Sequence, residues 1–144
     1  MNYKTSNPEE NKKIVSEFLE KLLPKEDIAT VVGLYGDLGS GKTTFTKSLA
    51  KFLGVEGVVI SPTFVIEKIY SLENKPFKHL IHIDAYRIEK SEEMLNLGWQ
   101  KIVSDKENLI VVEWPERISD ILPEHIKIKF DHITENERAI EIFE

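Results

Sequence analysis

The chain has 144 residues, a formal net charge of −6 at pH 7 and 41% hydrophobic residues, so we expect a single globular domain over residues 1–144. No apolar run reaches the roughly 18 residues that a membrane helix needs, and the first residues lack the apolar segment of a secretory signal. We therefore expect a cytoplasmic protein without membrane contact. The absence of cysteine excludes disulfides, thiolate nucleophiles and cysteine-ligated metal centres.

The charged residues limit the kinds of phosphate recognition that are open to this chain. An acidic net charge argues against direct binding of nucleic acid, which requires a basic face. Beside sixteen lysines the sequence has three arginines, Arg87, Arg117 and Arg138. Few bidentate contacts with phosphate are therefore possible.

The first predicted element is a helix that begins after Asn7. Asn7 can cap this helix, Pro8 suits its first position, and Glu9 and Glu10 lie at the positive end of its dipole. Apolar residues at helical spacing give it one buried face, and Pro24 marks its end. These apolar residues are Ile14, Val15, Phe18, Leu19 and Leu22.

A buried strand, a glycine-rich turn and a second helix follow. Residues 28–35 form a near-continuous apolar run rich in β-branched side chains, which is typical of a strand covered on both faces in a parallel sheet. The second helix is predicted from about Lys42 to Leu53, with Gly54 just after its carboxyl end.

The rest of the chain alternates between strands and one short helix. We expect strands at 58–61, 64–71, 79–84 and 109–113, a turn at 73–76 and a short helix at 91–97. The alternating segments 126–130 and 140–142 are typical of an antiparallel hairpin at the edge of a sheet. The predicted fold is therefore α/β, a P-loop NTPase-like three-layer sandwich with a mostly parallel central sheet and antiparallel strands at its edge.

The glycine-rich turn matches the phosphate-binding pattern G-x-x-x-x-G-K-[ST] in full. It lies between a buried strand and an amphipathic helix, where backbone N–H groups and the amino end of the helix bind phosphate oxygens. In this pattern the lysine reaches the β- and γ-phosphates and the following hydroxyl binds Mg²⁺. The guanine-reading pattern Asn-Lys-x-Asp is absent, so we predict ATP as the nucleotide. The residues assigned to nucleotide binding here are Gly36, Asp37, Leu38, Gly39, Ser40, Gly41, Lys42, Thr43 and Thr44.

Two predicted strands end in carboxylates, Asp84 and Glu113. Ligands of parallel α/β sheets bind at the carboxyl ends of the strands, so both acids are candidates to bind Mg²⁺ or to orient an attacking water. The alternative for each acid is a helix cap or a surface position. Thr63 follows a proline at a position where P-loop proteins often keep a switch hydroxyl for Mg²⁺ or the γ-phosphate, and the alternative is a plain turn residue.

Three further residues lie close to the two acids in the sequence. His82 shares a strand with Asp84, although a lone histidine is more often a packing residue than a catalytic one. Arg87 can contact phosphate or a partner, or form a surface ion pair of little energetic value. Trp114 is expected to pack or to lie at an interface.

Four motifs in this order resemble the TsaE family, also called YjeE. They are Gly36 to Thr44, Ser61-Pro62-Thr63-Phe64, His82-Ile83-Asp84-Ala85-Tyr86-Arg87 and Glu113-Trp114-Pro115. The resemblance covers about residues 7–143 and is far more specific than the phosphate loop alone. Members of the family are small bacterial ATPases required to make threonylcarbamoyladenosine in tRNA.

The resemblance implies an ATPase that binds ATP and Mg²⁺ and acts on a complex of TsaD and TsaB, with tRNA reached indirectly through that complex. It implies that Thr43 and Glu113 contact Mg²⁺ and that Asp84 serves in metal handling or hydrolysis. It also implies that Thr63 belongs to a switch segment. Arg138 corresponds to an arginine that the family tends to keep near the C-terminal hairpin. Asn11 stands where the family usually has a threonine near the nucleotide base.

Two other functions remain open from the sequence. A small-molecule kinase is a common use of a phosphate loop in a short chain, but kinases need a lid with several arginines and an acceptor pocket. A scaffold that binds nucleotide only to order an interface needs no hydrolysis, whereas two acids near the phosphates make hydrolysis possible. With the ATPase hypothesis, the catalytic candidates are Lys42, Asp84, Glu113 and Thr63.

Overall fold

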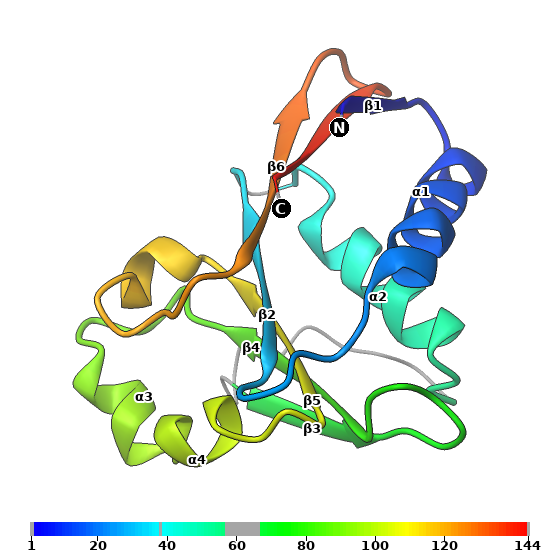
Figure 1. Ribbon diagram of the computed structural model, residues 1–144. Coiled ribbons are helices and arrows are strands. Elements are labelled where there is room, and N and C mark those ends of the chain that lie inside the picture. The colour runs from blue at the N-terminus through cyan, green and yellow to red at the C-terminus, as the bar shows by residue number, and fades with distance from the viewer. Residues whose placement is uncertain (1, 38, 57–66, 144) are drawn as a thin grey trace.

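A computed structural model of the chain describes residues 2–37, 39–56 and 67–143 (Figure 1). The elements in chain order are β1 (Asn2–Thr5), α1 (Pro8–Lys21), β2 (Thr30–Tyr35), α2 (Lys42–Phe52), β3 (Glu67–Ser71), β4 (His79–Asp84), α3 (Glu92–Asn96), α4 (Trp99–Val103), β5 (Asn108–Glu113), the 3₁₀ turn η1 (Pro115–Ile118), β6 (Ile126–His132) and β7 (Arg138–Phe143).

The strands form one mixed sheet in the order β1-β7-β6-β2-β5-β4-β3. The four central strands, β6, β2, β5 and β4, run parallel to one another. Antiparallel strands flank them, with β3 on one side and β7 followed by β1 on the other. The predicted α/β class with a mostly parallel core is therefore confirmed.

The predicted C-terminal hairpin forms beside the parallel strands, but β1 and not β7 is the strand at the edge of the sheet. β6 pairs with β2 in parallel, with Val32 opposite Ile126 and Leu34 opposite Ile128. β7 is then covered by β1, whose Tyr3 pairs with Ile140. The sequence analysis did not predict β1, because a four-residue strand with mostly exposed side chains has no hydrophobic pattern to reveal it.

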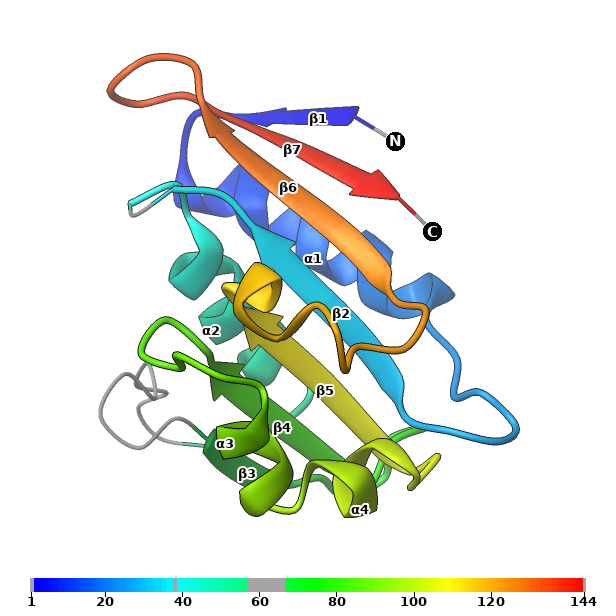
Figure 2. The same ribbon diagram turned by 90° about the vertical axis from the view of Figure 1, so that its left-hand side faces the viewer.

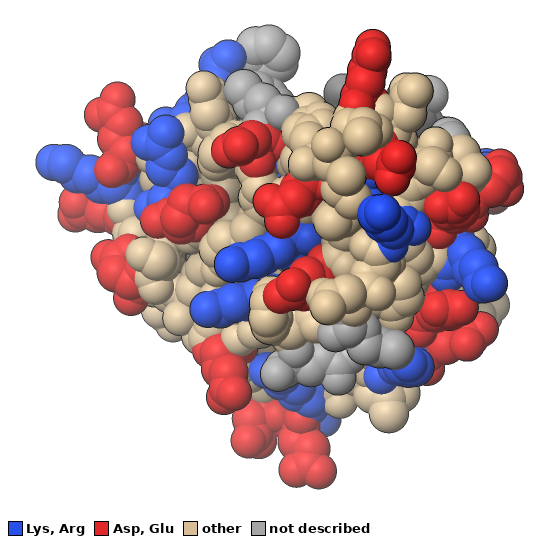
Figure 3. Space-filling model, turned by 90° about the horizontal axis from the view of Figure 1, so that it is seen from above, with Lys and Arg blue, Asp and Glu red and all other residues tan. Residues whose placement is uncertain are grey.

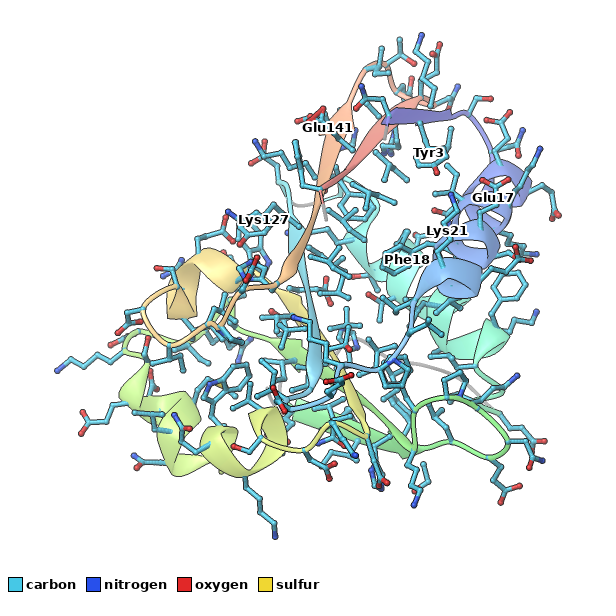
Figure 4. The ribbon with its side chains drawn as sticks, in the orientation of Figure 1. Tyr3, Glu17, Phe18, Lys21, Lys127 and Glu141 are labelled. Atoms are coloured by element: carbon cyan, nitrogen blue, oxygen red, sulfur yellow. The ribbon has the colours of Figure 1, made fainter. Side chains whose placement is uncertain are left out.

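Helices cover the two faces of the sheet. In Figures 1 and 2, α1 and α2 lie together on one face, and α3 and α4 lie on the other. Two apolar clusters correspond to these two faces, one containing Val32 and Phe45 and the other containing Val31 and Trp99. Figure 4 shows Tyr3 and Phe18 in the space between α1 and the sheet, whereas Lys127 and Glu141 lie on the opposite face.

The first helix begins and ends close to the predicted residues. The Asn7 side chain accepts a hydrogen bond from the Glu10 backbone N–H at 2.9 Å, and a Glu10 carboxylate oxygen accepts one from the Ser6 N–H at 3.0 Å. The first bond satisfies an N–H group that the first turn of a helix leaves unpaired, and the second joins the residue before the cap to the helix. The helix ends at Lys21, three residues before Pro24.

Several predicted boundaries differ from the observed ones. The second helix ends at Phe52, one residue early, and the helix predicted at 91–97 spans Glu92–Asn96. A further short helix, α4, and the turn η1 were not predicted. The strand predicted at 58–61 and the first residues of that predicted at 64–71 lie outside the described residues. In the part of the chain that the structure describes, no helix has the length and apolar character needed to cross a bilayer.

Candidate functional site

The parallel strands place the glycine-rich loop and the two acids at one edge of the sheet. Asp84 at the end of β4 pairs with Glu113 at the end of β5, and Glu113 in turn lies opposite Leu34 near the end of β2. Residues that pair across a sheet point to the same face. Asp84 and Glu113 therefore both point to the face that α2 covers, where the loop leads into that helix.

Gly36, the first residue of the loop, lies against the neighbouring strand. Its φ of 150° disfavours side chains, and a Cβ atom built there would lie 2.6 Å from the Phe130 carbonyl oxygen and 2.7 Å from the Ser40 hydroxyl. Both distances are shorter than any real Cβ contact. The first glycine of the pattern is therefore required by close packing of the loop on β6.

The amino end of α2 is open toward the cavity that the loop borders. Its N-cap, Gly41, has a φ of 107° and supplies no side-chain cap, so the first N–H groups of the helix are available to an anion. The Ser40 hydroxyl is buried, and no hydrogen-bond partner for it is found within the described ranges. A buried hydroxyl without a partner beside open helical N–H groups is the arrangement that a phosphate satisfies.

The ammonium of Lys42 is buried at the end of the loop. Its side chain is 5% exposed, and Nζ donates a 2.6 Å hydrogen bond to the Gly36 carbonyl oxygen. Nζ also lies 3.5 Å from the centroid of the Trp114 ring. Burial lowers the pKa of Lys42, and the charges of Glu113, Glu116, Asp84 and Asp37 act in the opposite direction.

Glu113 is held by two hydrogen bonds, one to each carboxylate oxygen. The Thr43 hydroxyl donates to Oε1 at 3.1 Å, and Nε2 of His82 lies 2.6 Å from Oε2. Because an ionised carboxylate can only accept, Nε2 is the donor when Glu113 is ionised. Its other nitrogen, Nδ1, is buried and has no partner among the described residues. His82 therefore fixes the position of Glu113, a role that the sequence left open.

Asp84 is also buried, with 6% of its surface exposed. Its Oδ1 accepts a 3.0 Å hydrogen bond from the Tyr86 backbone N–H, and the residue makes further interactions. The carboxylate thereby orders the start of the segment that follows β4.

A cavity of about 550 Å³ opens beside the loop, within the usual size of small-molecule sites. The two ends of the chain complete its wall, through Thr5–Asn7 before α1 and through the turn between β6 and β7. Arg138 lines the cavity and donates to the Glu135 carbonyl oxygen at 3.1 Å, so it orders that turn. The predicted residues that line it are Gly39, Ser40, Gly41, Lys42, Thr43, Thr44, Asp84, Glu113 and Arg138.

Among the remaining sequence candidates that the structure describes, Asn11 and Trp114 also line the cavity, whereas Gly36 and Asp37 do not. Gly36 packs against Phe130 of β6, and the Asp37 side chain is exposed. Leu38 and Thr63 lie outside the described residues, so their predicted roles stay predictions. Asn11 lines the cavity and donates to the Ser48 hydroxyl at 3.2 Å.

Other wall residues had no sequence signal. Thr5, Ser6, Glu135 and Asn136 reach the cavity because β1 and β7 pair beside β6, and only the sheet order reveals this. His82 is not among the residues that line the cavity. Its position on the same face of the sheet as Asp84 could have been predicted by period-two reasoning, since it lies two residues before Asp84, but its contact with Glu113 could not.

The side-chain oxygens of Thr43 and Glu113 suit a cation that is also bound by phosphate oxygens. Within the described ranges, no group of three or more His, Asp or Glu side chains could hold a metal by itself. Mg²⁺ takes one or two protein oxygens and completes its shell with water and phosphate, with about 2.9 Å between adjacent ligand oxygens. The 3.1 Å between Thr43 Oγ1 and Glu113 Oε1 is close to that separation.

Comparison with known proteins relates nearly the whole chain to one family. Residues 5–140 match the family model described as threonylcarbamoyl adenosine biosynthesis protein TsaE. Proteins named tRNA threonylcarbamoyladenosine biosynthesis protein TsaE from Bacillus subtilis and Rickettsia felis are 38% and 35% identical over 97% and 95% of this chain, and 83% and 76% of their own lengths. The crystal structure of Bacillus subtilis YdiB aligns with a TM-score of 0.74 and 33% identity over 97% of this chain and 82% of that one.

The close packing at Gly36 can be tested by comparison with a glycine that has open space around it. Gly36→Ala and Gly98→Ala both place a side chain at positive φ, but a Cβ at Gly98 would have no atom within 4 Å. We expect Gly36→Ala to lower the free energy of unfolding by about 1–3 kcal/mol more than Gly98→Ala does, because β6 must shift. Urea unfolding followed by circular dichroism measures both. Equal losses would contradict the close packing of the loop on β6.

Proposed function

The chain belongs to the TsaE family of tRNA threonylcarbamoyladenosine biosynthesis proteins, and from this premise we propose that it is a P-loop ATPase that binds ATP and Mg²⁺. Its ATP hydrolysis would support the modification reaction carried out by a complex of TsaD and TsaB homologues in the cytoplasm. This chain would reach tRNA only through that complex and would not perform the transfer itself.

One observation carries the proposal, the convergence of a phosphate-loop sequence and two buried acids on one cavity. The cavity borders the amino end of α2, the Lys42 ammonium and the carboxylates of Asp84 and Glu113. Phosphoryl transfer to water depends mainly on positioning and on charge stabilisation of the phosphoryl oxygens. A buried ammonium and open helical N–H groups supply that positive charge in a site of low dielectric.

The residues can be divided between phosphate, metal and water. Backbone N–H groups of residues 39–44 and the Lys42 ammonium would bind the phosphates. Thr43 and Glu113 would hold Mg²⁺, which neutralises the charge that develops on the phosphates. Asp84 would accept a proton from the water that attacks the γ-phosphorus as the bond to the β-phosphate oxygen breaks.

The charge distribution agrees with action on a protein complex. Figure 3 views the molecule from the edge where the parallel strands end, and acidic and basic side chains are interspersed across this face. A protein that grips tRNA directly needs a continuous basic surface. The described side chains on this face do not form one.

Removal of the Lys42 ammonium tests the phosphate site. We expect Lys42→Ala to lower kcat/KM for ATP hydrolysis at least about 100-fold, because no other described lysine lines the cavity. Lys47→Ala on the exposed side of the same helix is the matched control and should leave the rate unchanged. Phosphate release and nucleotide titration measure both variants, and wild-type activity of Lys42→Ala would refute the phosphate-loop assignment.

The two acids should differ in how they respond to magnesium. We expect Glu113→Gln and Thr43→Val to raise the Mg²⁺ concentration for half-maximal hydrolysis by about 10- to 100-fold, since they remove metal contacts. Asp84→Asn should instead lower the rate at saturating Mg²⁺ by at least about 100-fold. Glu124→Gln, an exposed acid that does not line the cavity, is the control, and circular dichroism verifies folding. The reverse pattern would exchange the roles of the two acids.

Partner proteins should accelerate hydrolysis. Arg87 and Arg117 are exposed and do not line the cavity, and Arg138, which does line it, donates to carbonyl groups of its own turn. An arginine ordered or supplied by a partner is worth about 10³–10⁵ in rate. We therefore expect slow turnover by the chain alone and faster turnover with TsaD and TsaB homologues, and a smaller gain for Arg87→Ala.

The same assay separates the other two functions. A fast rate of the isolated chain that partners do not change would contradict the prediction. Phosphate transfer to a metabolite would identify a kinase, and absence of turnover in every mixture would identify a nucleotide-dependent scaffold.

A further inference from the structure

The aromatic surroundings of Lys42 form a continuous stack that reaches the protein surface. Nζ of Lys42 lies 3.5 Å from the centroid of the Trp114 ring. The Trp114 and Tyr86 ring centroids are 5.2 Å apart, with a tilt of 56° between the rings. The Arg117 guanidinium carbon lies 5.8 Å from the Tyr86 centroid. Each distance is within the range of cation–π or aromatic contacts.

The backbone fixes the members of this stack relative to the two acids. Trp114 directly follows Glu113 and has a φ of 59°, which is unusual for a residue with a side chain. It caps η1, and the Arg117 N–H donates to the Trp114 carbonyl oxygen at 3.1 Å, so both side chains belong to one tight turn. Tyr86 is held by the hydrogen bond from its N–H to Asp84.

We propose that Trp114 is a positioning residue for Lys42 and that Tyr86 and Arg117 hold the Trp114 ring in place. Because Tyr86 and Arg117 lie at the protein surface, contacts made there change the position of the Lys42 ammonium. The consequence for nucleotide affinity rests on the proposed function, whereas the positioning itself does not. Tyr86 is 42% exposed and Arg117 is exposed, so a protein that contacts them acts on Lys42 without entering the cavity.

The contacts of Lys42 indicate that the Trp114 ring positions the ammonium for a ligand and does not withhold it from one. An ammonium has three N–H donors, and the Gly36 carbonyl oxygen and the Trp114 ring use two of them. A third donor remains for a ligand in the cavity that Lys42 lines. A free lysine side chain loses considerable rotamer entropy when it is fixed, and the ring fixes it before any ligand binds.

Magnetic resonance of the nucleotide-free protein tests the positioning directly. Protons above an aromatic face are shielded, so in the full chain labelled with ¹³C-lysine the ε-CH₂ signal that Lys42→Arg removes should lie upfield of the other lysines. Trp114→Leu should move this signal into the ordinary range, and Trp114→Phe should retain part of the shift. Tyr86→Leu and Arg117→Gln should produce intermediate positions. An unchanged Lys42 signal in Trp114→Leu would overturn the proposal, whatever the protein binds.

A second cation–π contact in the same protein provides the matched control. Lys129 Nζ lies 5.8 Å from the centroid of the exposed Phe143 ring, and neither of these two residues lines the cavity. Phe143→Leu should move the Lys129 signal alone. Backbone strain is the same in Trp114 and in its Leu variant, since both residues carry a Cβ, and thermal unfolding followed by circular dichroism verifies that each variant folds.

Titration with ADP measures the consequence for the site. We expect Trp114→Leu to weaken ADP binding about 30-fold and Arg117→Gln about 2- to 5-fold, with partial recovery in Trp114→Phe. Tighter binding by Trp114→Leu would mean that the ring withholds Lys42 from phosphate and would overturn the proposal. If the wild-type chain binds no ADP while the Lys42 signals behave as expected, the ATPase assignment fails and the positioning stands.

Discussion

The common end of three parallel strands is the constraint on which the site depends. Because Asp84, Glu113 and Leu34 are in register across β4, β5 and β2, the two acids and the loop after β2 cannot separate without a slip of the sheet. All six residues of β5 are buried, so a slip of one residue would turn its apolar side chains to the wrong faces and its carboxylate away from the cavity. The same packing that stabilises the core therefore fixes the geometry of the candidate site.

A second constraint joins the C-terminal hairpin to the loop. Phe130 of β6 places its carbonyl oxygen against Gly36, and its ring meets Phe45 of α2 edge-on with centroids 5.4 Å apart. Phe45 is fully buried and also contacts Phe18 of α1, at 6.1 Å between centroids. The rings of Phe18, Phe45 and Phe130 thus pack α1, α2 and β6 together. This apolar packing holds the hairpin that carries wall residues 135–138 beside the helix that follows the loop.

Sequence patterns predicted the features that depend on local order, and they failed where distant segments meet. The Asn7 cap, the buried β2 run and the acids at two strand ends are local signals, and each appeared where it was expected. The place of β6 inside the sheet depends on its pairing with β2, about ninety residues earlier, and its alternating side chains fit an edge position equally well. Neither the contact of His82 with Glu113 nor the lining by Arg138 follows from spacing alone, because both depend on which strands are neighbours.

The two opposite charges of the cavity are held by other groups and not by each other. Within the described ranges Lys42 forms no ion pair with Glu113, although Glu113 is the first of the charges that raise the pKa of Lys42 against the effect of burial. Instead a carbonyl oxygen and an aromatic ring hold the ammonium, and a hydroxyl and an imidazole hold the carboxylate. A direct ion pair would satisfy both groups and would have to break before a ligand could bind. Held apart, the ammonium can serve an anion and the carboxylate a cation, so the phosphate and metal that we propose for this site would require little rearrangement of it.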